Sequence, residues 1–550
     1  MSKDPESRKL NIAADLLLML LIAGFAFWVN RDIRIKGLYM DDLYMWSCYG
    51  EQSIWEFAFP IGTSTRFRPV YWLATYLQMM IVGTHITRFV TFNIVCNILV
   101  AWLVFLLAKR LSGCRYAGAA SAVCYLASRF AYYQIGQALG LMETMALLMA
   151  VVILYLLFLY IRAGRDKPED GADTDFTGGP LSRHESRSRH RREDSSGRTC
   201  FLPAVVLYFL LAFTHERYIS LFPLFYYALI VRALTEPKGM RMRSIRDRAL
   251  LWAAPAVALA LIVLIRSFAI GKALPAGTGG TEVTETFHIG ECLRYCISQV
   301  LYIFGVNDGP EHLNGLPWDQ TPPEIKRMTK FSVLAIGLVC IAFALKVIRE
   351  LAAKRREEAG RHVAESLLFG SFIALCIGCS SVTIRVEMRW IYVSYTAALL
   401  FAAYMIGELS GTDGLTVRRS LVTALFLVYA VLSVRCNLFY RGYYSRLYFW
   451  PNQLRMNSLA EQTVEKYGTD GIFGKDIYIL ENTYEMTDFY ARTFFKTYDP
   501  EKKAEGTRVL FADSIASIPP EDLKEGRVLV LEEVPEENAY RDITDSVIPD

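Results

Sequence analysis

The sequence predicts an α-helical, polytopic membrane protein with a small α/β domain at its C-terminus. Hydrophobic residues make up 53% of the 550 residues and aromatic residues 13%, and long apolar runs recur as far as residue 436. After that residue the chain becomes charged and aromatic. A hydrocarbon core of about 30 Å needs roughly 20 apolar residues per helix, and the runs predict about eleven such spans. This composition excludes an ordinary soluble enzyme.

The first apolar run, 12–29, follows Lys3, Arg8 and Lys9, and no small-residue cleavage site comes after it. We therefore predict an uncleaved anchor. The other ten spans are expected at 86–108, 116–134, 139–161, 201–214, 216–231, 249–269, 331–349, 364–382, 390–408 and 420–436. The run 68–82 is shorter, and counting it as a span would move the next basic cluster to the wrong face. It is expected to be an amphipathic helix on the outer surface.

Clusters of Lys and Arg fall in alternate loops, on the side of the N-terminus. Basic residues favour the cytoplasmic side, so the N-terminus is expected in the cytoplasm, the C-terminus outside, and the chain in the plasma (inner) membrane. Residues 1–436 then form the membrane domain, with outer loops at 30–85 and 270–330 and a polar, disordered cytoplasmic loop at 163–200.

Residues 437–550 are expected to form the soluble outer α/β domain. Its strand candidates are the apolar stretches 476–480, 508–511 and 526–530, and helical stretches at 453–467 and 484–496 alternate with them.

Unusual polar residues gather at the predicted outer ends of several spans. Ionisable groups at this depth are costly unless they are paired or face a watery cavity, so we predict that these residues line one functional cavity. Each one alone is also an ordinary charge at a helix end. They are Asp41 and Asp42; Gln134, Gln137 and Glu143; His215, Glu216 and Arg217; and Arg385, Glu387 and Arg389.

Carboxylates and arginines beside a bilayer fit one reaction, the transfer of a sugar from a polyprenyl-phosphate lipid. Asp41 or Asp42 could take the proton of an acceptor hydroxyl, while arginines hold the phosphate leaving group. An inverting transfer needs only this one protein base, because a phosphate paired with Arg leaves without a proton. No His, Cys and Asp pattern has metal-ligand spacing, so no cofactor is required and a divalent cation is optional.

Four segments of the chain resemble motifs of the GT-C superfamily of membrane glycosyltransferases, which includes the protein mannosyltransferases. YMDDLYMW (39–46) is similar to the acidic motif of its first outer loop, and TRFRPVYWL (65–73) to the segment that follows. FTHERYISLFPLFYY (213–227) and EMRWIYVSYTAALLFA (387–402) resemble later turns and helix starts. The resemblance covers about residues 10–436.

The resemblance implies an inverting glycosyltransferase with Asp41 as base and Asp42 as its substitute. It implies that Arg389 contacts the lipid phosphate, that His215 or Glu216 lines the pocket, and that Arg66, Arg68 and Arg217 are further phosphate or acceptor contacts. With Arg385, these residues make up the expected donor side. Gln134, Gln137, Glu143 and Tyr392 make up the expected acceptor side. The chain departs from common members in having His215 where Lys is frequent and in lacking a Pro after the late Arg-aromatic pair.

Other functions remain open at this point. A transporter or flippase for an envelope lipid or glycan precursor is the main alternative, but its usual inverted repeats and broken midplane helices are not evident. A polymerase of another fold would carry a large outer loop rich in Arg and His, whereas 270–330 has few of either. A scaffold is the third alternative. The expected partners are the lipid-linked sugar, membrane lipid and an extracytoplasmic acceptor, without nucleic acid.

Overall fold

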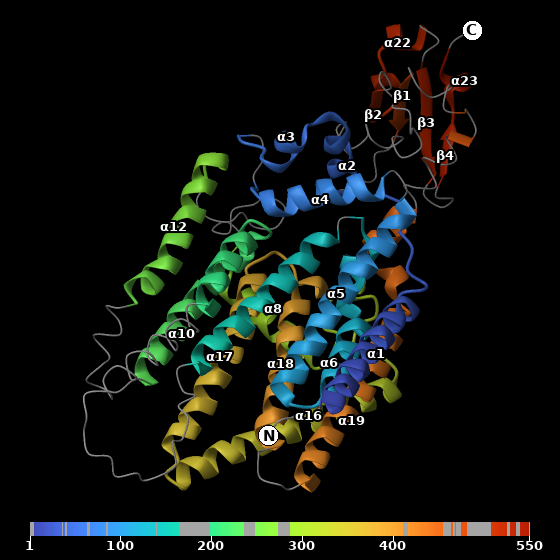
Figure 1. Cartoon of the computed structure of the whole chain (residues 1–550). Coiled ribbons are helices and arrows are strands. Elements are labelled where there is room, and N and C mark those ends of the chain that lie inside the picture. The colour runs from blue at the N-terminus through green and yellow to red at the C-terminus, as the bar shows by residue number, and fades with distance from the viewer. Residues whose placement is uncertain are drawn as a thin grey trace, which may run out of the picture.

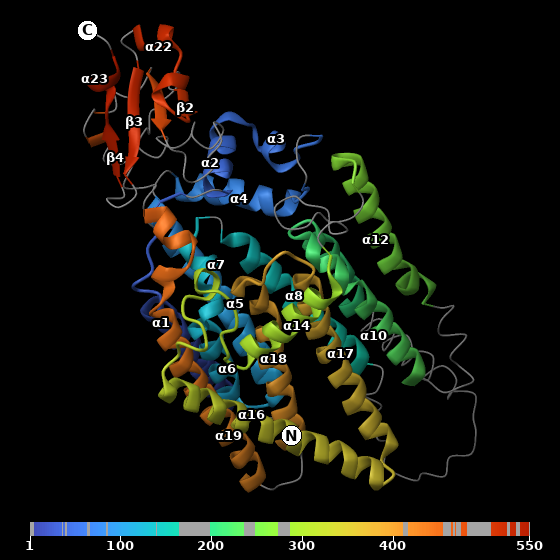
Figure 2. The ribbon, with the colours of Figure 1, turned by 180° about the vertical axis from the view of Figure 1, so that it is seen from behind.

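The computed structural model describes residues 5–35, 37–38, 41–62, 66–83, 86–138, 140–163, 199–235, 248–272, 287–410, 416–454, 464–465, 468, 475–480, 508–524, 528–534 and 539–548. These residues form a helical bundle with a small sheet at one end, which we call the sheet end (Figures 1 and 2). Within them, nine helical segments are long and apolar enough to cross a membrane. They are α1 (Pro5–Val29), α5 (Ile86–Ser112), α8 (Leu141–Arg162), η2 with α10 (Glu216–Leu221 and Phe222–Thr235), α12 (Ala249–Ile270), α16 (Pro323–Ala352), α17 (Arg356–Ser381), α18 (Met388–Ser410) and α19 (Thr416–Arg441).

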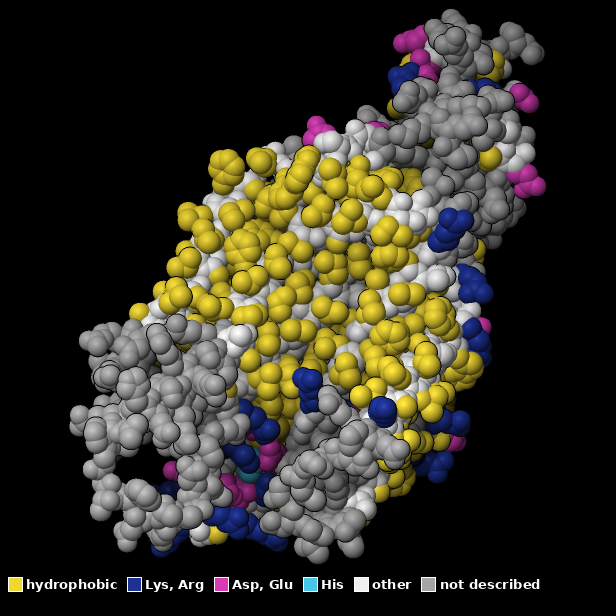
Figure 3. Space-filling model, in the orientation of Figure 1, with side chains coloured by type: hydrophobic (Ala, Val, Ile, Leu, Met, Phe, Trp, Pro, Cys, Tyr) yellow, Lys and Arg dark blue, Asp and Glu magenta, His cyan; other side chains and the backbone are white. Residues whose placement is uncertain are grey.

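The surface of the bundle matches a membrane environment. On the face in Figure 3, hydrophobic side chains cover most of the height, and Lys and Arg gather toward the end opposite the sheet. Many apolar side chains of the outer helices point outward; Phe268 of α12, for example, is 80% exposed and Leu20 of α1 is 68% exposed. Such a surface is stable only when lipid covers it, so the chain is an integral membrane protein.

Two of the eleven predicted spans form shorter helices. One lies at Thr199–Ala212, and the other, expected at 116–134, is α6 (Arg115–Ala127). The prediction of a continuous helix over 116–134 is wrong because Ser128 leaves the helical conformation, with ψ 136°, and its hydroxyl caps η1 (Arg129–Ala131). α7 (Tyr132–Gly136) follows. Thirteen residues rise only about 20 Å, less than the hydrocarbon core.

Short helices lie across the sheet end of the bundle. α2 (Asp41–Glu51), α3 (Ile54–Ala58) and α4 (Pro69–Val82) follow α1, and α4 runs across the ends of the long helices in Figure 1. The expected helix at 68–82 is therefore present, with Tyr71 and Trp72 buried and Ile81 72% exposed. Between α12 and α16 lie α14 (Ile289–Ile303) and α15 (Glu311–Asn314), and η5 (Tyr444–Arg446) follows α19.

Toward the end opposite the sheet, two helices are packed tightly enough to require glycine. α18 lies against α5, and a Cβ atom on Gly407 of α18 would stand 2.1 Å from the Leu111 carbonyl oxygen of α5. Small residues let membrane helices approach at backbone distance, and here only glycine fits.

A charged network ties four helices together at the end opposite the sheet. Arg162 of α8 binds Glu365 of α17 through two hydrogen bonds, Nε to Oε1 at 2.9 Å and Nη2 to Oε2 at 3.1 Å. The buried His362 ring contacts Glu350 of α16 at 2.7 Å and Glu408 of α18 at 2.9 Å. The helix ends are thus fixed by pairing, which is what buried charge requires.

The C-terminal sheet has the strand order β2-β1-β3-β4. β1 (Asp476–Leu480) pairs in parallel with β2 (Arg508–Ala512) and β3 (Val528–Val534), and β3 pairs antiparallel with β4 (Ala539–Asp542). The three expected strands are present; β4 was not expected. The short helices η7 (Ile515–Ser517), α22 (Pro520–Lys524) and α23 (Thr544–Val547) complete the described part. Most of the helical stretches predicted at 453–467 and 484–496, and residues 164–198 of the expected disordered loop, lie outside it.

Candidate functional site

A buried ion pair joins the first loop to the η2 turn at the sheet end. Arg68 precedes α4, where Pro69 supplies the fixed φ that suits a helix start. Its Nε donates to Glu216 Oε2 at 2.6 Å and its Nη2 to Oε1 at 2.7 Å. Burial acts against the charge of Arg68, but the Glu216 carboxylate outweighs it and raises the pKa of Arg68.

Further charges surround this pair. Arg66 lies close enough to Arg68, Glu216, Asp41 and Arg389 for each of them to act on its charge. We call these five residues the Arg66 cluster. The Arg68 guanidinium, followed by burial, lowers the pKa of Arg66. The cluster contains three guanidinium groups and two carboxylates, and Glu387 adds a third carboxylate beside Arg389.

The two neighbouring aspartates lie in different surroundings. α2 begins at Asp41, so both carboxylates are in its first turn, where the helix dipole favours negative charge. Asp41 is exposed, and no hydrogen bond to its carboxylate is found in the described part of the chain. Asp42 is only 3% exposed, and its Oδ2 accepts the Ala138 N–H at 3.3 Å. Asp41 is therefore accessible to another molecule, whereas Asp42 holds α2 against the turn after α7.

Arg389 is held at the start of α18 by one carboxylate and one ring. Its Nε lies 2.5 Å from Glu387 Oε2, and Glu387 also accepts a 2.7 Å hydrogen bond from Arg385 Nε. The Arg389 guanidinium carbon lies 4.0 Å from the centroid of the Tyr133 ring, a cation–π contact. Within the described residues, the terminal nitrogens of Arg389 have no hydrogen-bond acceptor, so they remain available to an anion.

His215 and Arg217 flank Glu216 in the η2 turn, and neither brings an unbalanced charge to the site. His215 Nδ1 accepts the Arg217 N–H at 3.4 Å as the cap of η2. Burial, together with Arg217 and Arg68, holds the pKa of His215 well below its ordinary value, so this ring is neutral. The Arg217 side chain pairs with buried Glu143 of α8 and donates to the Tyr218 hydroxyl at 2.9 Å. Arg217 and Glu143 thus neutralise each other.

Three of the expected pocket residues make contacts within the buried interior. Gln134 accepts a 2.9 Å hydrogen bond from Asn97 of α5, and the Gln137 carbonyl accepts one at 2.8 Å from Asn93. These two bonds hold α7 and the turn after it against α5. Tyr392 is 1% exposed, stacks on Tyr125 at 4.6 Å and donates to its carbonyl at 2.8 Å. Tyr392 lies about one helical turn from Arg389, within the core, and its role as a pocket residue stays a prediction.

Comparison with known proteins gives distant structural likeness only. The solved structure of ArnT from Cupriavidus metallidurans bound to undecaprenyl phosphate matches with a TM-score of 0.46 and 10% identity, over 97% of this chain and 94% of that one. An Archaeoglobus fulgidus oligosaccharyltransferase in complex with Zn and sulfate matches with a TM-score of 0.46 and 12% identity, over 94% and 68%. No family model matches, and neither does any curated protein. The function proposed below rests on this chain's own side chains.

One residue beside the cluster was not predicted from the sequence. Arg266 of α12 is 0% exposed, and none of its three guanidinium nitrogens has a hydrogen-bond partner among the described residues. It lies close enough to Glu216 and Arg68 to interact with their charges. The signal was present, since Arg266 is the one ionisable residue in the apolar run 249–270. A charge inside a membrane helix usually marks a functional position.

The described residues contain no group of three or more His, Cys, Asp or Glu side chains that could hold a metal ion. The sequence-based expectation that a divalent cation is optional remains a prediction. The chemistry that the cluster itself can supply is proton transfer at Asp41 and charge stabilisation by arginines.

Proposed function

We propose that this protein is an inverting glycosyltransferase that moves a sugar from a polyprenyl-phosphate lipid to an acceptor on the sheet side of the membrane. The observation that carries the proposal is the Arg66 cluster, in which the accessible Asp41 carboxylate and the Arg389 guanidinium both act on the charge of Arg66. This cluster lies where the membrane helices end. A lipid phosphate lies at the same depth, since its chain fills the hydrocarbon layer.

The proposed reaction uses Asp41 as general base. The hydroxyl of the acceptor gives its proton to the Asp41 carboxylate as its oxygen forms a bond to the anomeric carbon of the sugar. The bond between that carbon and the phosphate oxygen breaks at the same time, and its electron pair stays with the phosphate. Attack from the face opposite the phosphate inverts the anomeric centre, so no protein nucleophile is needed.

Arginines would stabilise the phosphate as its negative charge increases. Arg389 offers its terminal nitrogens, and Arg66 adds a second cation whose own charge is destabilised by Arg68. A bound phosphate relieves the repulsion between the Arg66 and Arg68 guanidinium groups. The site therefore favours the departing phosphate anion over an empty space between the two cations. Arg266 is a third candidate, because a guanidinium without partners is costly in a membrane helix until an anion pairs with it.

The remaining charged residues support this arrangement. Arg68 and Glu216 saturate each other, as do Arg217 and Glu143, so they position the first loop and η2 around the cluster. Arg385 holds Glu387, which in turn orients Arg389. Asp42 anchors α2 and thereby places Asp41. Each of these is a positioning role. The C-terminal sheet is proposed either to bind or shield the acceptor or to cap the membrane domain.

The test is sugar transfer in membranes supplied with a panel of labelled polyprenyl-phosphate hexoses and pentoses. The readout is movement of label out of the lipid fraction. Asp41→Asn is expected to lower transfer by about 10²- to 10⁴-fold, the usual contribution of a general base, at unchanged protein abundance. Asp319→Asn, the same change at an exposed position of the outer loop, is the matched control.

Three outcomes decide between the functions. Loss of transfer in Asp41→Asn with normal transfer in the control supports the proposal. Full activity in the Asp41→Asn, Asp42→Asn double variant rules out an aspartate base. Movement of intact labelled lipid across the membrane, unchanged in Asp41→Asn and without sugar transfer, would instead identify a flippase.

A further inference from the structure

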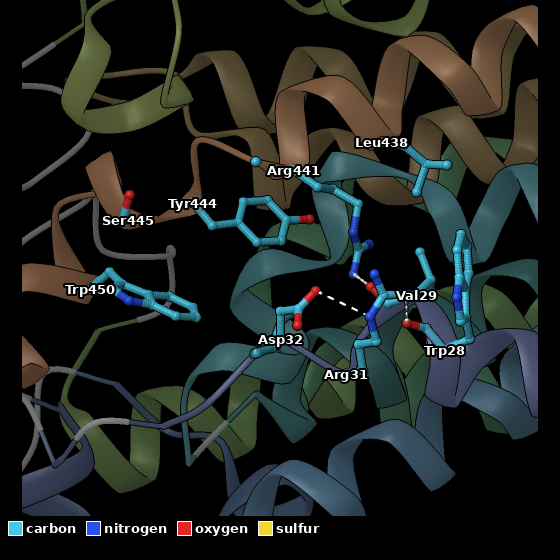
Figure 4. Close-up of a pocket in the computed structure, with 11 residues that line it drawn as sticks. Trp28, Val29, Arg31, Asp32, Leu438, Arg441, Tyr444, Ser445 and Trp450 are labelled. Carbon is cyan, nitrogen blue, oxygen red and sulfur yellow. Dashed lines mark hydrogen bonds and ion pairs between the residues drawn. The ribbon is translucent and has the colours of Figure 1, made fainter.

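A pocket separate from the Arg66 cluster lies at the sheet end, where α1 and α19 end (Figure 4). Its volume is about 420 Å³, within the range of roughly 300–1,000 Å³ that small-molecule sites occupy. No residue of the Arg66 cluster lines it. The residues that the argument uses are Trp28, Arg31, Asp32, Arg441, Tyr444 and Trp450.

Arg441 gives the pocket a buried positive charge. This side chain ends α19 and is 8% exposed. Its Nη1 donates to the carbonyls of Leu126 and Ser128 at 3.2 and 3.1 Å, and its Nη2 donates to the Val29 carbonyl at 3.1 Å and to the Asn30 side chain. All four acceptors are neutral. The described residues therefore satisfy the hydrogen bonds of Arg441 and leave its charge without a carboxylate partner.

Arg31 adds a second, accessible cation. Its guanidinium carbon lies 5.0 Å from the Trp28 ring centroid, and its Nη1 donates to the Trp28 carbonyl at 3.3 Å. Trp28 is 49% exposed at the end of a membrane helix. Trp and Arg at such a position anchor a protein at the level of lipid headgroups.

The pocket also contains one acid and two further aromatic rings. Asp32 lies 3.5 Å from Arg31 Nε, but its side chain is 86% exposed, so this pair is weak and open to exchange. In the view of Figure 4, the Asp32 carboxylate lies between the Trp450 ring on one side and the two guanidinium groups on the other, with Tyr444 above it. Across this view the two guanidinium groups, the Asp32 carboxylate and the Trp450 ring therefore follow one another.

We propose that this pocket binds the phosphoethanolamine headgroup of a membrane phospholipid. The phosphate would face Arg31 and Arg441, and the ammonium group would face Asp32 and the Trp450 ring, which offers a cation–π surface. Val29 and Leu438 line the pocket from the two membrane helices, so the lipid chains can continue down their apolar surface. A purely anionic headgroup satisfies the arginines but is repelled by Asp32.

This inference does not depend on the proposed sugar transfer. The test is purified full-length protein in nanodiscs made of equal parts phosphatidylethanolamine, phosphatidylglycerol and phosphatidylcholine, followed by mass spectrometry of the retained lipids. Wild type is expected to retain phosphatidylethanolamine preferentially. Phosphatidylcholine is an informative competitor, because its quaternary ammonium cannot donate a hydrogen bond to Asp32.

Asp32→Asn is expected to reduce the preference for phosphatidylethanolamine over phosphatidylcholine by about two- to five-fold, the usual range for an exposed charge pair. Arg31→Gln is expected to weaken retention of both lipids. The matched controls are Asp319→Asn and Arg327→Gln, which change the same charges at exposed positions outside the pocket. Arg441 is unsuitable for substitution, since its bonds hold α1 and α6 to α19.

Equal retention of all three lipids overturns the proposal, as does enrichment of phosphatidylglycerol. A preference that Asp32→Asn leaves unchanged also overturns it. Sugar transfer measured on the same samples separates the two proposals: normal transfer with lost lipid preference is expected for Asp32→Asn, and loss of transfer would show that the variant disturbs more than this pocket.

Discussion

Arg68 and Glu216 are 148 positions apart in the sequence, and they meet in a two-point ion pair with contacts of 2.6 and 2.7 Å. Both side chains are nearly excluded from solvent, at 9% and 5% exposure. The pair connects the loop before α4 to η2, and beside it the Phe67 ring packs edge-on against Phe213 at 6.0 Å between ring centroids.

Breaking this pair from one side is expected to destabilise the protein. Arg68→Met or Glu216→Gln leaves one buried charge without its partner, which costs about 3–5 kcal/mol. The double variant Arg68→Met, Glu216→Leu is expected to recover a large part of that loss, because it removes both charges. Thermal unfolding of the detergent-solubilised protein measures both effects.

The control is Glu324→Gln, which breaks an exposed pair with Arg327 and is expected to change stability by less than about 1 kcal/mol. Equal losses in the buried and exposed pairs would contradict the prediction.

Replacing Arg266 is expected to move stability and donor binding in opposite directions. Arg266→Met removes a buried charge that has no partner among the described residues, so the ligand-free protein becomes more stable. The apparent affinity for the lipid donor is expected to fall by about tenfold or more, the loss of one charge-assisted hydrogen bond. Unfolding temperatures with and without the polyprenyl-phosphate sugar report both quantities.

The control is Arg294→Met, at an exposed position of α14, which is expected to change neither the stability nor the donor affinity. A destabilised variant with unchanged donor affinity would show that Arg266 has a structural role.

The neutral His215 ring makes stability depend on pH in a defined direction. Burial and then Arg217 hold the pKa of His215 below its ordinary value of 6.5, so the folded state binds fewer protons than the unfolded state in acid. The contribution of His215 to the free energy of unfolding is therefore complete above about pH 6.5. It is lost as the pH falls below that value, by at most about 1.4 kcal/mol per pH unit.

His215→Asn is expected to have a flatter stability profile between pH 6.5 and 5, and His288→Asn, at an exposed position, is expected to follow wild type. Identical slopes in wild type and His215→Asn would disprove the prediction.

The turn after α7 has no room for a side chain at Gly140. A Cβ atom there would stand 2.2 Å from the Gln134 carbonyl oxygen, a contact that the backbone must move to relieve. Gly140→Ala is expected to cost about 1–3 kcal/mol and to displace Ala138, whose N–H binds Asp42. Sugar transfer is therefore expected to fall together with stability.

The control is Gly337→Ala in α16, where no atom lies within 4 Å of the added Cβ, and it is expected to stabilise the protein by about 0.5–1 kcal/mol. Equal stability of the two variants would argue against strain at Gly140.

The sequence predicts the helices well where apolar residues run without interruption, because length and burial in lipid then dominate local preferences. It fails at Ser128, where a single hydroxyl caps a new turn and ends α6 early. It also fails at β4, since AYRD (539–542) is short and polar and forms a strand only because β3 lies beside it. Both errors arise where one hydrogen bond or one tertiary contact decides the structure.

The candidate site could also be predicted in part from the sequence. The predicted topology puts Asp41, Glu216 and Arg389 at one end of the bundle, and in the structure all three lie close enough to Arg66 to act on its charge. Which charges neutralise each other depends on side-chain directions that no sequence pattern supplies, as with Arg217 and Glu143. The sequence likewise gives no sign that the Tyr392 hydroxyl donates to the Tyr125 carbonyl within the core.

The η2 turn binds two different parts of the molecule through adjacent residues, Glu216 to the loop before α4 and Arg217 to α8. If α4 moved without η2, the Arg68–Glu216 pair would break and leave a buried cation and a buried anion without their partners. Separating η2 from α8 would break the buried Arg217–Glu143 pair in the same way, so we expect the first loop, η2 and α8 to move together. A lipid headgroup that enters beneath α4 would have to displace all three segments at once.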